Sequence, residues 1–135
     1  MNYPEADAAI KNYFATQWNN ATEVAYDDVK FDVPQGQTWA RLNIQFADGS
    51  QASTGSPGSN KFRKEGIVTV QVFAPEGGAS VSTLTTVNQV MNIFEAKARI
   101  NGILFKNVRA ISDGNDGAGW HQVNVKADFE FDTIK

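Results

Sequence analysis

The side chains able to carry out acid–base or nucleophilic chemistry are few in this sequence. The chain has 135 residues, no cysteine and a single histidine, His121. A Ser-His-Asp arrangement would have to use that histidine as its base. His121 shares the parity of Val123 and Val125 in an alternating apolar pattern, which favours a structural role. Asp27 and Asp28 lie in a polar connection, where solvated carboxylates are favoured over a catalytic pair. The sequence therefore predicts no enzyme.

Motifs for metals and nucleotides are equally weak. Residues 113–119 superficially resemble a calcium loop, but Gly117, Ala118 and Asn124 stand where a ligand, the invariant glycine and the bidentate glutamate belong. No glycine-rich run ends in Lys-Ser or Lys-Thr, so there is no P-loop. Without thiolates or a carboxylate set at ligand spacing, we predict no metal and no cofactor.

One local cluster of charge stands out. Lys61, Arg63 and Lys64 lie beside Glu65 where a polar segment enters an apolar strand. One interpretation is a charged strand entrance that discourages aggregation. The other is a contact with an acidic neighbour, such as a second copy of the chain.

Composition and length set the broad class. We expect one domain over residues 1–135. The formal net charge of −3 gives no reason to expect duplex DNA binding through a broad basic face. No apolar run approaches the ~20 residues of a membrane span, and the polar start lacks the regions of a signal peptide. Together with the absence of cysteine, this favours an intracellular protein without a membrane partner.

The chain is organised around residues 62–96. Residues 66–73 are β-branched and apolar, which predicts a strand. Pro75 and the following glycines end it, and a helix is expected over residues 80–96. Its apolar stripe consists of Leu84, Val87, Met91 and Phe94, widened by Val81, Val90 and Ala98.

The remaining elements are expected to cover this unit. They are a helix over residues 4–18, a short strand at 24–26, a strand at 39–46, a hairpin turn at Asn101-Gly102 whose second arm runs to Ile111, a flexible loop at 113–119 and a strand at 123–131. In the last strand Val123, Val125, Ala127, Phe129 and Phe131 alternate with polar residues, so one face of the sheet is expected to be open. The predicted fold is α+β, with two helices packed on one face of a mainly antiparallel sheet.

Residues 48–60 contain no large apolar side chain. Such a segment cannot bury enough surface to offset the entropy lost on ordering. We therefore expect a mobile loop, either simply solvated or used to bind a partner.

The central stretch resembles a known family. Residues 63–78, RKEGIVTVQVFAPEGG, and residues 119–125, GWHQVNV, are similar to segments of the tail terminator proteins of long-tailed bacteriophages and related prophages. In that family a basic residue and a glycine precede a valine-rich strand, Phe-Xaa-Pro and a glycine-rich turn follow, and Gly-Trp-aromatic opens the last strand. His121 replaces the more usual aromatic. The resemblance covers nearly the whole chain.

The resemblance implies a structural virion protein without catalytic activity. It implies a small α+β subunit that forms a ring, a hexamer, on the finished tail tube, stops its polymerisation and offers a docking surface for the head. The implied partners are a second copy, the tail tube protein and a head-completion or connector protein, with DNA only passing through the lumen. The implied location is the tail–neck region of the virion, after assembly in the cytoplasm of the bacterial host.

A ring requires two unlike patches on each subunit. The basic cluster and the polar side of the last strand are the candidates. The predicted interface residues are Lys61, Arg63, Lys64, Glu65, Asp128, Glu130 and Asp132. Three alternatives stay open: a head-completion or neck protein, a small-ligand-binding α+β domain, and an acid–base enzyme using His121.

Overall fold

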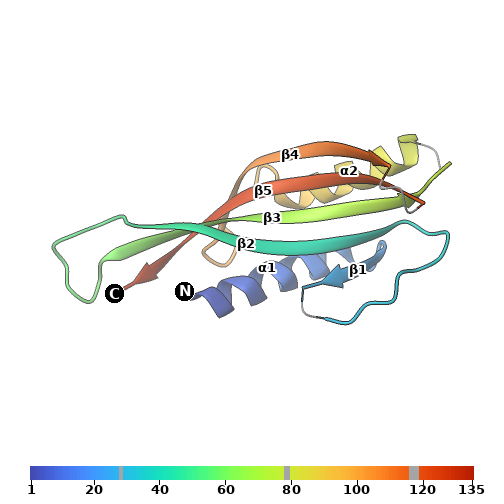
Figure 1. Cartoon of the computed structure of the whole chain (residues 1–135). Helices are drawn as coiled ribbons and strands as arrows, with labels where there is room; N and C mark the ends of the chain where they lie inside the picture. The colour runs from blue at the N-terminus through green and yellow to red at the C-terminus, as the bar shows by residue number, and fades with distance from the viewer. Residues whose placement is uncertain (28, 78–79, 116–118) are drawn as a thin grey trace.

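The computed structural model describes residues 1–27, 29–77, 80–115 and 119–135. In chain order the elements are α1 (Tyr3–Trp18), β1 (Glu23–Tyr26), β2 (Trp39–Gln51), β3 (Lys61–Pro75), α2 (Ser80–Phe94), β4 (Leu104–Asn115) and β5 (Trp120–Ile134). The sheet has the order β1-β2-β3-β5-β4, and the β1–β2 pair alone is parallel. Both helices lie on one face of the sheet (Figure 1). The predicted α+β fold is therefore confirmed.

Helix α1 begins and ends as its sequence predicts. The Asn2 side chain accepts a hydrogen bond from Glu5 N (2.9 Å), and Asn2 N donates to Glu5 Oε1 (3.1 Å), which forms a capping box. Asn19 takes a left-handed conformation (φ 50°) and its N–H bonds Ala15 O, which closes the last turn. The buried face carries Ala6, Ile10, Phe14 and Trp18.

The sheet supplies the other half of the core through alternate residues. On β5 the five apolar residues predicted to face inward are all buried: Val123, Val125, Ala127, Phe129 and Phe131. Val68, Val70 and Val72 of β3 face the same layer. Gly66 of this strand leaves room for Phe129, because a Cβ at Gly66 would lie 2.5 Å from Phe129 Cζ and from Gln45 O.

The apolar face of α2 is rotated from the predicted one. Leu84 was expected to be buried, but its side chain is 54% exposed, whereas Thr83 is 4% exposed. The buried stripe runs through Thr83, Val87, Val90 and Phe94, at spacings of four, three and four. The predicted and the observed stripe share Val87 and Phe94. The prediction chose Leu84 because leucine is more hydrophobic than threonine, but Thr83 is the residue that faces the core. The helix also ends at Phe94, so Ala98 lies beyond it and is exposed.

The loop predicted at residues 48–60 is shorter in the structure, because residues 48–51 belong to a strand of a long hairpin. β2 continues to Gln51 and β3 begins at Lys61, so the connecting loop is residues 52–60. We call residues 47–65 together with β5 residues 131–134 the arm. Figure 1 shows the arm extending past the ends of both helices. Its strands pair in the ladder, for example with Gln51 opposite Phe62, and Ala52 N donates a hydrogen bond to Lys61 O (2.7 Å) where the loop begins. Mobility of residues 52–60 stays a prediction.

Two other turns were predicted from the sequence, and the structure agrees with each of them in part. Asn101 and Gly102 have positive φ (50° and 85°), and Ile100 and Ile103 exchange two backbone hydrogen bonds of 2.8 and 2.9 Å. The tight turn is confirmed, although the residues before it form only a single β-bridge, between Ile100 and Ile103, rather than a strand. The loop predicted at residues 113–119 is shorter, since β4 extends through Asn115, and residues 116–118 lie outside the described part of the chain.

The aromatic packing of Phe94 gives a test of the core. Its ring lies 5.0 Å from that of Phe105 and 6.1 Å from that of Phe14, and 1% of Phe94 is exposed. Phe94→Ala should therefore lower the free energy of unfolding by roughly 3–5 kcal/mol. Leu84→Ala is the matched control and should cost less than ~1 kcal/mol, because Leu84 is exposed. Urea denaturation measures both, and the reverse ranking would show that the helix phase is wrong.

Candidate functional site

The face of the sheet opposite the helices carries most of the charged strand residues. We call it the open face. Its side chains come from alternate positions of four strands and lie side by side in the strand register: Arg41, Asn43 and Gln45 of β2, Arg63, Glu65, Thr69 and Gln71 of β3, Lys106 and Arg109 of β4, and Asn124, Lys126, Asp128, Glu130 and Asp132 of β5. A polar face of this kind is suited to contact with another polar surface.

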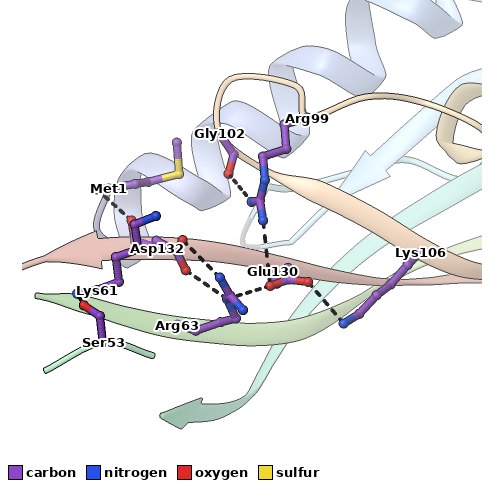
Figure 2. Close-up of polar contacts among 9 residues, drawn as sticks. All are labelled: Met1, Ser53, Lys61, Arg63, Arg99, Gly102, Lys106, Glu130 and Asp132. Atoms are coloured by element: carbon purple, nitrogen blue, oxygen red, sulfur yellow. Dashed lines mark hydrogen bonds and ion pairs between the residues drawn. The ribbon is translucent and has the colours of Figure 1, made fainter. Parts of the chain in front are cut away.

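A network of ion pairs lies on the open face at the base of the arm (Figure 2). Arg63 of β3 lies directly opposite Asp132 of β5. Its Nε donates to Asp132 Oδ1 (3.0 Å) and its Nη2 to Oδ2 (3.4 Å). Lys106 Nζ donates to Glu130 Oε1 (3.2 Å), and Arg99 Nη2 lies 4.0 Å from Glu130 Oε2. We call these five side chains the arm-base network.

Glu130 is the buried centre of this network. Its side chain is 9% exposed. Arg63 Nε lies 2.8 Å from Glu130 Oε2, but that nitrogen directs its hydrogen toward Asp132, so Oε2 is buried without a hydrogen bond. The contact is thus one of charge attraction. Burying a carboxylate is costly unless cations surround it, and Arg63, Lys106 and Arg99 offset that cost for Glu130.

Asp128, two residues before Glu130 on β5, is the centre of a second polar cluster. Arg109 Nη1 donates to Asp128 Oδ1 (3.2 Å), and Asn107 Nδ2 donates to Oδ2 (3.1 Å). Both partners come from the irregular part of β4, where the register with β5 shifts between Lys106 and Arg109. The bulge thereby places two donors around one carboxylate.

Several of the residues predicted to form an intersubunit interface lie close together in the structure. Some of them, however, form ion pairs with one another within a single subunit. Arg63 binds Glu130 and Asp132 of its own chain. Lys64 points to the other face, with its Nζ 6.0 Å above the ring of Tyr3. Lys61 is exposed. The intersubunit contact stays a prediction. Arg63 already binds acids of its own chain, so it is not available to bind a second subunit only.

The sequence did not reveal Arg99 and Lys106 as members of the network. Both precede Glu130 by more than twenty residues, so their contact with it depends on the strand register. A signal existed for Lys106, because an alternating β4 paired with β5 would place Lys106 beside Asp128 and Glu130. No such signal exists for Arg99, which lies in the turn before β4.

A groove of about 620 Å³ crosses the open face beside β1. Its floor consists of polar side chains from β2, β3 and β5, including Arg41 and Lys126, and its wall includes Tyr26 and Phe31. Asp27 in this wall accepts hydrogen bonds from Asn43 Nδ2 and Ile44 N (both 3.1 Å). Asp27 therefore fixes the connection to β2, as a structural group.

An aromatic cluster closes one end of the open face. Trp39 stacks on Phe73 (ring centroids 4.3 Å apart) and on Phe31 (5.3 Å), and Trp120 contacts Trp39 edge-on at 6.0 Å. At this end the open face is covered by residues of the connection after β1. These aromatic residues form a second, smaller core, which was not predicted from the sequence.

The described residues offer no arrangement for catalysis by metal. Within residues 1–27, 29–77, 80–115 and 119–135, no three His, Cys, Asp or Glu side chains gather so that they could hold a metal ion. Asp113, from the loop that resembled a calcium site, instead accepts a hydrogen bond from Asn124 Nδ2 (2.7 Å). No helix in that part of the chain is long and apolar enough to cross a membrane.

Comparison with known proteins identifies the family. Residues 5–129 match the family described as phage tail terminator protein. The chain belongs to the phage tail terminator family. As a member it is a structural protein of the phage tail, and the family resemblance noted in its sequence is confirmed. A comparison with curated protein sequences finds no match.

Solved structures show the same fold in other members of this structural class. One protein, whose name states no function, has a TM-score of 0.64 and 18% identity, and the match covers 95% of this chain and 94% of the other. A chain from the virion of a native gene transfer agent (GTA) particle has a TM-score of 0.51 and 14% identity, with 94% of each chain covered. At these identities the likeness concerns the fold alone.

The arm-base network makes the stability of this terminator-family subunit sensitive to acid. The hydrogen bond from Arg63 lowers the pKa of Asp132, against the opposing effect of partial burial. The folded pKa thus lies below the unfolded value of about 4. The stability from ionised Asp132 is complete above the unfolded pKa and is lost as the pH falls through the folded one.

Asp132→Asn should therefore flatten the acid limb of the stability curve. Urea midpoints measured between about pH 5 and pH 2 should fall less steeply for this variant than for the wild type, because the amide does not titrate. Asp7→Asn, which removes an exposed salt bridge to Lys11 on α1, is the control for loss of a surface carboxylate. An identical slope in Asp132→Asn and the wild type would contradict the assignment.

Proposed function

We propose that this protein closes into a ring on the end of the finished tail tube and stops tube polymerisation. The observation that carries the proposal is the family match over residues 5–129, which includes every described helix and strand except the ends of α1 and β5. The function therefore belongs to this fold as a whole. In this proposal the chain acts as a single domain.

The proposed ring is a hexamer with a heterologous interface, in which one patch of each subunit meets a different patch of the next. The arm and the open face support such an assembly. The arm extends beyond the helices (Figure 1), and the open face carries charged side chains that no helix covers. Charge complementarity would set the register of the subunits more than the affinity.

The ring would sit in the neck region of the virion. One rim would contact the tail tube protein and the other a head-completion or connector protein, while DNA passes through the lumen. Assembly would take place in the cytoplasm of the bacterial host. The proposal assigns no reaction to the protein. His121 is part of β5, opposite Ala74 in the ladder, and serves the fold in this account.

Deletion of the gene tests the function directly. A phage that lacks this protein should make tails that are over-long or that fail to join heads, because nothing ends tube growth or offers the docking surface. Electron microscopy of lysates gives the distribution of tail lengths, and plaque counts give infectivity. Expression of the wild-type protein in trans is the control and should restore both. Normal tails and full infectivity in the deletion would refute the proposal.

A further inference from the structure

Two acids on the arm form no salt bridge within the described residues. Asp48 of β2 and Glu65 of β3 lie directly opposite each other in the ladder, and Glu65 lies opposite Glu130 in turn. Arg63 and Lys106 bind Glu130, but neither Asp48 nor Glu65 makes an ion pair within the described residues. Like charges directly opposite in a sheet are unfavourable. Arg63 on the same face attracts Glu65 but is itself bound to Glu130 and Asp132, so the arm presents an acidic pair on the open face that is only partly compensated.

Two cations in the groove lack an acidic partner. Arg41 lies with its Cζ 5.4 Å from the ring centroid of Trp39, and Lys126 lies on β5 beside Thr69. Both line the groove, and neither forms a salt bridge in the part of the chain that the structure describes. Arg109, the cross-strand neighbour of Lys126, is already bound to Asp128. Asp27 is the one carboxylate in the described lining, and it is bound to Asn43 and Ile44, so the groove has an excess of positive charge.

The acidic pair and the groove cations cannot meet within one subunit. Asp48 follows Arg41 by seven positions along β2, which is roughly 23 Å along a strand at about 3.3 Å per residue. The arm also points away from the groove, beyond the helices (Figure 1). A second copy of the chain is the partner that carries the complementary charge in each case.

We propose that the arm of one subunit lies across the groove of the next, with Asp48 and Glu65 facing Arg41 and Lys126. The ring geometry rests on the proposed function, while the charge pairing rests on the unpaired groups themselves. The two patches differ and lie at separate places on the subunit, so the contact is heterologous and can repeat around a ring.

The polar chemistry of the two surfaces is also matched. The groove floor holds amide and hydroxyl side chains, among them Gln45, Thr69 and Gln71. The arm loop, residues 52–60, is rich in serine and glycine and carries no charge. Hydroxyl and backbone groups of such a loop can satisfy amide donors and acceptors, whereas an apolar occupant would leave them without partners.

Cross-linking tests the contact. A water-soluble carbodiimide joins a lysine amine to a carboxylate that touches it. Rings formed by a mixture of ¹⁴N- and ¹⁵N-labelled full-length protein, alone and on purified tail tubes, are treated and digested. Mass spectrometry should find Lys126 joined to Asp48 or Glu65 in peptides of mixed labels. Rings without this cross-link would overturn the inference and leave the proposed function intact. A link from Lys126 to a tail tube carboxylate would overturn it in favour of a different partner.

Charge reversal is the second test of the contact. Glu65→Lys and Lys126→Glu should each weaken self-association, measured by sedimentation velocity, on the order of tenfold or more. The double variant should restore it, because opposite charges face each other again. Glu95→Lys and Lys97→Glu, at exposed positions after α2, are the controls with equal changes in net charge and should assemble normally.

Folding of each variant is checked by its thermal melt. If Glu65→Lys does not fold, Asp48→Lys replaces it, since Asp48 is exposed. Failure of the double variant to recover, with both single variants folded and weakened, would overturn the pairing. Absence of any self-associated species of the wild type, alone or on tubes, would overturn both this inference and the proposed ring.

Discussion

The fold depends on β3, which pairs with β5 from Lys61 to Pro75 along one edge and with β2 from Phe62 to Phe73 along the other. Alternation along this strand sends Val68, Val70 and Val72 into the helix-facing core and leaves its odd-numbered residues on the open face. The helices can then cover the apolar face of the sheet up to the arm. Gly66 marks the point where the covered body passes into the arm, since its missing side chain admits the ring of Phe129.

Past that point the chain is stabilised differently. The body is held by apolar burial, whereas the arm beyond the buried Phe131 relies on strand pairing and on the arm-base network around Glu130. Those charges are largely satisfied within one chain, which fixes the arm to the body in a defined direction. A projecting, polar and firmly based arm is suited to a structural protein that acts by contact, and it fits the membership of a phage tail family better than it fits an enzyme.

Periodicity predicted the parts of the fold that bury apolar residues. The helix over residues 4–18 and the alternation of Val123 to Phe131 were correct because burial leaves a pattern in the sequence itself. The arm was missed because strands held by a polar ladder carry no such pattern. Leu84 was misplaced because two stripes on α2 differ by one position, and packing against the sheet decides between them. The Arg63–Asp132 pair was also hidden, since it requires the register between strands 69 residues apart.

The central claim is that this subunit belongs at the end of the tail tube, and localisation tests it most directly. Purified virions and free tails can be labelled with a gold-conjugated antibody raised against the protein and examined by negative-stain electron microscopy. The account predicts gold at one end of each tail, at the junction with the head in complete virions. Gold distributed along the tube, or found on heads that lack tails and never on free tails, would contradict it.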